Sequence, residues 1–296
     1  MSHAVLAGVD GSGHSLVAAE WAAREAVLRG VPLRLVHAAP PLPGGTVPHQ
    51  AGETLRRVGE RIVQGVIADL AARHPDLRLD GAQRAEAPAE ALLSAACDAG
   101  LLVVGARGSG GFNGLAVGSV ALRVAAAGDC PVVVVPGQRP GGFGNGARPA
   151  GTATQVVVGF DAHRPVDEVA DFAFGEARAR GAVLRAVQSW AFPAEAVSPR
   201  TLFVTEEDRA TWEDQEVLGL SDALRTQQEK YPEVTVRADV VLLHPAEALL
   251  NTSRGSDLLV VGRRAGRGGG EGRLGPVTHA VLHHAGCPVA VVPHDG

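Results

Sequence analysis

The sequence predicts an α/β protein built as two tandem copies of one doubly wound unit, each with a five-stranded parallel sheet and helices on both faces. Three observations predict this class. The chain repeats itself. Apolar runs of strand length alternate with helical patterns in each copy. Several of these runs are apolar throughout, as strands covered by helices on both faces must be. With 296 residues, the chain has room for two domains of ordinary size.

The repeat sets the alignment of the two copies. Asp10 follows an apolar run near the start, and Asp161 follows a similar run 151 positions later. The six residues that begin at Pro88 recur letter for letter from Pro245, at an offset of 157. Self-similarity at a fixed period indicates two copies of one structural unit.

The composition between the copies indicates where each one ends. Residues 137–151 contain six glycines and two prolines and show no apolar periodicity, which is typical of a linker. We therefore predict a first domain over 1–137, a linker over 138–153 and a second domain over 154–296.

Within the first copy, strands are expected near 4–9, 33–38, 77–83, 101–105 and 132–136, and helices near 14–29, 52–73, 88–98 and 118–127. Strands that alternate with helices form βαβ units, and so a parallel, Rossmann-like sheet. Such sheets bind ligands beyond the carboxyl ends of the strands, where the strand order reverses. A site is therefore expected in the connections after the first and fourth strands.

The composition excludes several classes of protein. The apolar fraction of 46%, the charged fraction of 20% and the net charge of −5 predict a soluble globular protein without a broad basic surface for nucleic acid or anionic membrane. The N-terminus does not resemble a signal peptide, and no apolar run is long enough to span a bilayer. We expect a cytoplasmic protein. Its three cysteines, Cys97, Cys130 and Cys287, have no metal or redox spacing and are predicted to be buried, reduced thiols.

One connection carries a sharp chemical signal. After the predicted fourth strand come Gly105 and Gly108, then nine further residues, then Gly118 and Ser119 at the start of a helix. Glycines let the backbone approach an anion closely, and a helix N-terminus supplies free amides and partial positive charge. Ser119 adds a hydroxyl donor. The loop is not a P-loop, because no Lys-Ser or Lys-Thr follows the glycines. It is interpreted as a phosphate-binding loop.

This spacing resembles the ATP-binding signature of the universal stress protein family, in its tandem two-domain form. The family signature is Gly, two residues, Gly, nine residues, Gly, then Ser or Thr, and all four positions match. The resemblance covers almost the whole chain and includes the residues from Val9 to Ser12. It implies a Rossmann-like fold in each copy and an ATP site in the first.

The resemblance also implies roles for single residues. Asp10 corresponds to an aspartate on the adenine and ribose side, and Ala38 to a position whose backbone meets the adenine. Gly105 would lie near the ribose. The phosphates would be surrounded by Gly108, Gly118, Ser119 and Val120. The family often binds Mg²⁺ with the nucleotide, and because no carboxylate cluster marks a dedicated metal site, phosphates and water would largely hold it. From the residues alone, Asp10 could instead simply cap the following helix.

The second copy departs from the signature. Gly262 and Gly275 are kept, but Ala265 replaces the second glycine and Pro276 replaces the serine. If the second glycine needs a positive φ, alanine costs about 1 kcal/mol there. Proline lacks both the hydroxyl and the amide, although it suits the first turn of a helix. We therefore predict that the second copy binds ATP weakly or not at all.

Four arginines in residues 263–273 leave two alternatives open for this loop. Their side chains could replace the phosphate contacts that the backbone has lost, or they could belong to a solvated loop. Elsewhere, His279 and His283 have the spacing of a metal-binding pair but no suitable partner, and exposed histidines are the preferred interpretation. His37 is interpreted as a core or edge histidine rather than a catalytic one.

The sequence contains no nucleophile-and-base motif. The favoured function is a regulatory protein that binds an adenine nucleotide and acts on an unknown partner. The alternatives are an interaction protein with a vestigial loop, and a slow ATPase. The resemblance further implies that the last strands of the copies, at 132–135 and 289–292, pair with each other within the chain, and that chains pair again as a homodimer.

Overall fold

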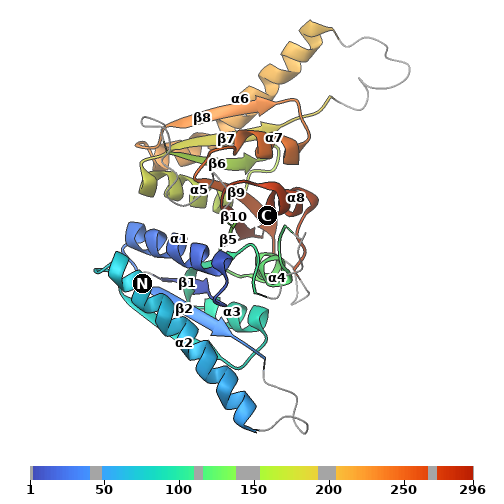
Figure 1. The fold of residues 1–296 in the computed structure, drawn as a ribbon. Coiled ribbons are helices and arrows are strands. Elements are labelled where there is room, and N and C mark those ends of the chain that lie inside the picture. The colour runs from blue at the N-terminus through green and yellow to red at the C-terminus, as the bar shows by residue number, and fades with distance from the viewer. Residues whose placement is uncertain are drawn as a thin grey trace.

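The computed structural model describes residues 3–40, 49–109, 116–137, 154–192, 205–265 and 272–295. Strands and helices alternate along the chain, as predicted (Figure 1). The first half consists of β1 (Ala4–Gly8), α1 (Gly13–Arg29), β2 (Leu33–Ala38), α2 (His49–Arg73), β3 (Leu79–Arg84), α3 (Pro88–Ala96), β4 (Ala99–Gly105), α4 (Ser119–Ala127) and β5 (Val132–Val135). The second half consists of β6 (Gln155–Phe160), α5 (Asp167–Arg180), β7 (Val183–Ser189), α6 (Glu206–Lys230), β8 (Val236–Val241), α7 (Pro245–Thr252), β9 (Leu258–Arg264), α8 (Pro276–His284) and β10 (Val289–His294). The predicted linker, 138–153, lies outside the described residues.

The described strands form a single ten-stranded sheet in the order β3-β2-β1-β4-β5-β10-β9-β6-β7-β8. Within each half, neighbouring strands are parallel, which confirms the predicted fold class. The halves join where β5 and β10 pair antiparallel, with Val133 opposite Ala290. The prediction that the last strands of the two copies pair within the chain is therefore confirmed. The pairing leaves neither strand with an open edge.

Helices cover both faces of the sheet, and each face has its own apolar core that extends through both halves. One core contains buried residues of α1, α2, α5 and α6, and the other contains buried residues of α3, α4, α7 and α8. In β1, Val5 and Ala7 face the first core and Leu6 faces the second. Burial on both faces explains why these strands are apolar throughout. The strand order reverses between β1 and β4, so the connections after these two strands lie where doubly wound sheets bind ligands.

Four charged side chains join α1 to α5 across the junction of the halves, and we call them the interhelix charge cluster: Glu25, Arg29, Glu176 and Arg180. Both glutamates are buried, and each contacts both arginines. Glu176 and Arg180 stand 151 positions after Glu25 and Arg29, so each copy contributes the same pair. The Arg180 guanidinium also lies over the ring of Trp21, 5.8 Å from its centre. The cluster is a charged link between the halves, in addition to the pairing of β5 with β10.

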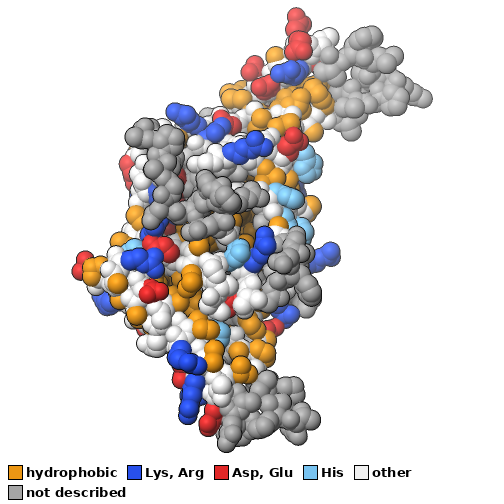
Figure 2. All heavy atoms as spheres, viewed as in Figure 1, with side chains coloured by type: hydrophobic (Ala, Val, Ile, Leu, Met, Phe, Trp, Pro, Cys, Tyr) orange, Lys and Arg blue, Asp and Glu red, His pale blue; other side chains and the backbone are white. Residues whose placement is uncertain are grey.

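The described surface is of mixed charge on the face that Figure 2 shows, with acidic and basic side chains interspersed. Among the helices of the described residues, none combines the length and the apolar character needed to cross a membrane.

Candidate functional site

The turn after β1 is held in place by Asp10. Its carboxylate accepts a hydrogen bond from the Ser12 amide at 3.0 Å and one from the Ser109 amide at 2.6 Å. The residue that caps α1 is Ser12, whose side chain accepts from the Ser15 amide. Asp10 is therefore not a simple helix cap, because it ties the connection after β1 to the connection after β4.

The hydrogen bonds to Asp10 also set its charge. Burial raises the pKa of this carboxyl, but its hydrogen bonds with Ser12, Ser109 and Ser15 together lower it by more, so the pKa lies below its ordinary value. The stabilisation that the ionised carboxyl provides is therefore complete above the ordinary carboxyl pKa of about 3.9, and it is lost only as the pH falls through the lowered folded-state value. Asp10 thus carries its charge at neutral pH.

Gly108 lies directly against this carboxylate. A Cβ atom at Gly108 would lie 2.6 Å from Asp10 Oδ2. Among the described glycines, positive φ angles occur at Gly11, Gly30, Gly181 and Gly255, so the possibility that position 108 needs a left-handed backbone is wrong. The close approach of Asp10 is the reason for glycine at this position.

Gly105 is glycine for a different reason. A Cβ atom there would lie 2.8 Å from the carbonyl carbon and oxygen of His14 and 3.1 Å from the Ser15 amide nitrogen. The first turn of α1 thus crosses directly over the end of β4, and a side chain at Gly105 would push it away. The absent side chain therefore serves helix packing, and a contact of Gly105 with ribose stays a prediction.

The chain enters α4 at the same edge of the sheet, after residues 110–115, which lie outside the described part. Gly118 is the N-cap of α4, and its amide donates to the Ala106 carbonyl at 2.7 Å. This hydrogen bond fixes the start of α4 against the end of β4. Ser119 and Val120 are the first two helical residues, and their amides have no carbonyl within the helix to receive them. Together with the helix dipole they form an end of α4 that favours anions.

Ala38 ends β2, and its register partner is Arg84 of β3. The preceding residue, His37, has its Nδ1 atom 2.8 Å from the Val9 carbonyl oxygen, so the imidazole bridges the ends of β2 and β1. A Cβ atom on Gly59 would lie 2.4 Å from His37 Cδ2, which shows that α2 passes closely over the ring. These contacts support the interpretation of His37 as an edge histidine with a packing role.

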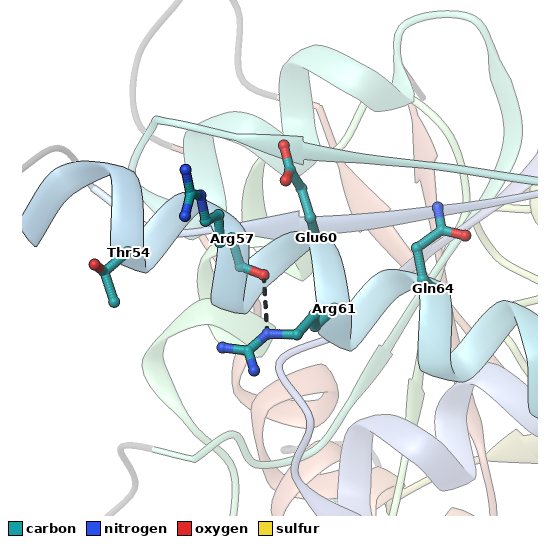
Figure 3. A pocket seen from close by; sticks show the side chains of 5 residues that line it. All are labelled: Thr54, Arg57, Glu60, Arg61 and Gln64. Atoms are coloured by element: carbon teal, nitrogen blue, oxygen red, sulfur yellow. Dashed lines mark hydrogen bonds between the residues drawn. The ribbon is translucent and has the colours of Figure 1, made fainter. Parts of the chain in front are cut away.

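A hollow of about 580 Å³ lies along the outer side of α2 (Figure 3). Arg61 Nε donates to the Arg57 carbonyl at 3.4 Å beside it. The described residues that line the hollow all belong to α2: Thr54, Arg57, Glu60, Arg61 and Gln64. Because none of them lies in the connections after β1 or β4, we assign this hollow no part in the site.

In the second half, the aspartate that corresponds to Asp10 is paired locally. Asp161 accepts from the His163 amide at 3.1 Å and from Arg164 Nε at 3.3 Å. The residue that corresponds to Ser109 is Gly266, which lies outside the described residues. The carboxylate of the second half is thus partly neutralised by a neighbouring cation.

The strands of the second half also continue further at this edge. β9 extends past Gly262 and pairs Arg263 and Arg264 with the end of β10, and the Ala265 amide then donates to the His294 carbonyl at 2.7 Å. Backbone groups that could meet a phosphate are thereby used in the sheet. Pro276 stands at the first helical position of α8. The helix start is kept while one amide is lost.

The arginine-rich loop contains one clear departure from both sequence interpretations. Arg263 is buried, and its Nη2 atom donates to the Gly128 carbonyl of the first half at 2.6 Å. It is therefore neither a solvated loop residue nor a substitute for the lost phosphate contacts. Arg273 is exposed, and Arg267 lies outside the described residues.

The second half also differs on the side that corresponds to Ala38. Trp190 follows β7, where Ala39 follows β2 in the first half. Its buried ring packs edge-on against Phe192 at 5.4 Å between ring centres, and Phe192 packs against Trp212 of α6 at 5.8 Å. Sequence analysis missed this aromatic cluster. The available signal was three large rings in one copy of a chain with only 4% aromatic residues.

The histidines of α8 lie together, with the rings of His279 and His283 4.5 Å apart between centres. Burial, and then the neighbouring His279 and His284, lower the pKa of His283. Within the described part of the chain, no group of three or more His, Cys, Asp or Glu residues is placed to hold a metal ion.

The cysteines differ in their surroundings. Burial raises the pKa of the Cys130 thiol to about 11 and that of Cys287 to about 12. Cys97 is exposed, so the prediction of buried thiols is wrong for this residue. It lies just beyond the end of α3, where the apolar pattern gives way to the surface.

Known proteins resemble this chain over both halves. A family model described as the universal stress protein family matches residues 1–136 and again residues 153–293. A universal stress protein of Mycolicibacterium smegmatis is 34% identical over 305 residues, covering 98% of this chain and 97% of its own length. One of Mycobacterium tuberculosis is 33% identical over 301 residues, covering 98% and 96%. In fold, the crystal structure of a universal stress protein from Archaeoglobus fulgidus matches with a TM-score of 0.69 at 16% identity, covering 99% of this chain and 97% of the other.

Proposed function

Because this chain belongs to the universal stress protein family and its first half keeps the whole glycine loop, we propose that the first half binds ATP and that the protein acts as a nucleotide-dependent regulator. One observation supports this above the others. The Asp10 carboxylate lies 2.6 Å from the Ser109 amide, at the edge of the sheet where α4 begins. An adenine nucleotide needs this combination of a ribose acceptor beside an anion-binding backbone.

In the proposed complex the nucleotide lies across the carboxyl ends of β2, β1 and β4. The adenine is placed at Ala38 and the ribose at Asp10 and Gly105. The phosphates are placed at the N-terminus of α4, where the amides of Ser119 and Val120 lack helical partners. The remaining phosphate contacts come from the Gly108 backbone and the Ser119 hydroxyl. Gly118, whose amide already donates to the Ala106 carbonyl, lies beside the phosphates. The helix dipole also favours the negative phosphates at this end of α4.

The residues present suit Mg²⁺ only as a companion of the nucleotide. Asp10 is ionised and is the carboxylate that the structure brings to this edge, but it already accepts two amide hydrogen bonds. Mg²⁺ prefers several waters and phosphate oxygens when few carboxylates are offered. Phosphates and water would therefore hold most of its coordination sphere.

The same contacts favour regulation over catalysis. Asp10 is engaged by two amides, and His37 Nδ1 is engaged by the Val9 carbonyl. Neither is placed as a general base with a nucleophile beside it, the arrangement that nucleophilic catalysis assisted by a general base uses. A slow ATPase remains the second candidate, and turnover that is lost with Asp10 or Ser119 substitutions would favour it.

The second half is proposed to bind ATP weakly or not at all. Asp161 is paired with Arg164, the backbone after Gly262 is used in the sheet, and Pro276 removes an amide. An aromatic cluster also occupies the side that corresponds to Ala38 and Ala39. Asymmetry between the halves is thus proposed on both the phosphate side and the adenine side.

A homodimer stays a prediction, but one surface that it could have used is already occupied within the chain. The strands that the family resemblance assigns to pairing are β5 and β10, and they are used inside the chain. A dimer would therefore have to use another face. A light-scattering mass of one chain would contradict it.

Matched aspartate substitutions test the proposed site. Titration calorimetry with ATP and Mg²⁺ is expected to show binding that Asp10→Asn weakens by about tenfold to 100-fold, because a neutral amide replaces a charged acceptor. The equivalent change in the second half, Asp161→Asn, is expected to leave the affinity within about twofold, as for independent sites. Equal losses in both variants would contradict the assignment of the site to the first half. No binding by the unaltered protein would overturn the proposed function.

A further inference from the structure

The buried arginine of the second half contacts the helix that begins at the proposed phosphate site. Arg263 is the counterpart of Ala106 in the first half, at the offset of 157. Its side chain crosses to the first half and donates to the Gly128 carbonyl at 2.6 Å. Gly128 is the C-cap of α4, the helix that starts at Gly118 and Ser119. One end of α4 thus faces the proposed nucleotide, and the other end is held by the second half.

The chemistry of this contact suits the end of a helix. The last carbonyls of a helix have no partner within it and carry partial negative charge. An arginine that donates to such a carbonyl satisfies a hydrogen bond and complements the dipole. α4 runs only from Ser119 to Ala127, so its two ends are close enough to move as one rigid body.

A second contact holds the same turn of α4. A Cβ atom on Gly272 would lie 1.7 Å from the Ala126 carbonyl oxygen and 3.2 Å from Ala127 Cα. The segment that returns toward α8 therefore lies against the last turn of α4, and only glycine fits there. Arg263 lies near the end of β9, and Gly272 lies shortly before α8 begins, so they stand on either side of the stretch that has lost the phosphate signature. We call the described residues there, 263–265 and 272–275, the second-half loop.

Stability alone is a weak reason for Arg263. For a buried cation, the free energy gained from one strong hydrogen bond is largely offset by the cost of removing the charge from water. In addition, the Nε atom of Arg263 is buried without a hydrogen-bond partner. Burial lowers the pKa of Arg263, and Asp129 offsets this only in part. A purely packed interface would be served as well by an apolar side chain.

We propose that Arg263 is a positioning residue through which the second-half loop sets the place of α4, and so of the amides that face the nucleotide. The loop that no longer binds phosphate in its own half thus holds the phosphate-binding helix of the other half. This inference rests on the proposed function, since the nucleotide at the N-terminus of α4 is the ligand concerned. By linkage, ATP binding and docking of the second-half loop strengthen each other to the same extent.

Substitutions at Arg263 in the full-length protein test the coupling. Arg263→Met keeps much of the packing volume and removes the charge and the hydrogen bond, and it is expected to weaken ATP binding about fivefold to tenfold in titration calorimetry. Arg263→Lys keeps the charge and is expected to recover part of the affinity. Arg273→Met, which alters an exposed arginine of the same loop, is the matched control and is expected to bind as the unaltered protein does.

Amide hydrogen exchange of the second-half loop distinguishes a positioning role of Arg263 from a role in stability alone. In the unaltered protein, ATP is expected to slow amide hydrogen exchange in residues 272–278 and in the last turn of α4, and this protection is expected to disappear in Arg263→Met. Unchanged ATP affinity in Arg263→Met, or exchange in 272–278 that ATP does not alter, would overturn the coupling. If Arg263→Met does not fold, the coupling is tested by the exchange experiment on the unaltered protein and by the titration of Arg263→Lys. Absence of ATP binding by the unaltered protein would instead overturn the proposed function, and the coupling with it.

Discussion

Arg180→Ala is expected to lower the free energy of unfolding by about 3–5 kcal/mol, the range seen when one partner of a buried ion pair is removed. Arg180 contacts both buried glutamates of the interhelix charge cluster, and its own side chain is only 9% exposed. Without it, Glu25 and Glu176 face each other with Arg29 as their shared partner. The expected loss exceeds that of an ordinary surface substitution because two carboxylates stay buried beside a single cation.

Urea denaturation followed by tryptophan fluorescence measures this loss, since Trp21 lies beneath Arg180. Arg34→Ala is the matched control, because Arg34 pairs with Asp80 at 3.5 Å with both side chains largely exposed. That change is expected to cost at most about 1 kcal/mol. A loss of similar size in both variants would mean that the interhelix charge cluster contributes no more than a surface ion pair.

Gly118→Asp is expected to weaken ATP binding by at least about 100-fold while the protein stays folded. Gly118 is the N-cap of α4 with a φ of −84°, which any residue can adopt, and aspartate is among the best N-cap residues. A Cβ atom there would meet only ordinary contacts, at 3.7 Å from the Ala106 carbonyl oxygen. The new carboxylate, however, would stand where the phosphates are proposed to bind, and repulsion between charges a few ångströms apart amounts to about 4 kcal/mol near a protein surface.

Two controls isolate the charge. Gly118→Asn has nearly the same shape and cap preference without the charge, and it is expected to keep most of the affinity. Gly275→Asp places the same carboxylate at the N-cap of α8 in the second half, where a Cβ atom meets no neighbour, and it is expected to leave ATP binding unchanged. Titration calorimetry compares the four proteins. A Gly118→Asp protein that binds ATP as tightly as Gly118→Asn would contradict the placement of the phosphates.

Much of the fold could be predicted because the information is local. Apolar strands such as 132–135 and glycine stops such as Gly30, which adopts a left-handed backbone at the end of α1, act within a few residues. Some element boundaries differ from the prediction: α2 begins at His49 and β3 at Leu79, against the predicted 52 and 77. β3 lies at an edge of the sheet, where alternating exposure weakens the apolar signal.

The reasons behind the site residues could not be predicted from local patterns. The resemblance identifies Gly105 and Gly108. Only the packed structure shows that Gly105 makes room for α1 and that Gly108 makes room for Asp10. The contact of Arg263 with Gly128 joins residues 135 positions apart. The interhelix charge cluster could have been recognised, because its members recur at the repeat offset. Its burial depends on how the halves pair, which the repeat alone does not determine.

The first half is proposed to bind ATP, and the second half is proposed to bind it weakly or not at all. The most direct test is to denature freshly purified protein and to measure the released nucleotide by chromatography and mass spectrometry. About one ATP per chain is the expected result, from a site in the first half alone. Two per chain would contradict the account, because the second half would then bind ATP despite Asp161–Arg164 pairing, Ala265 and Pro276. No nucleotide, together with no binding in a later titration, would contradict the assignment of an ATP site to either half.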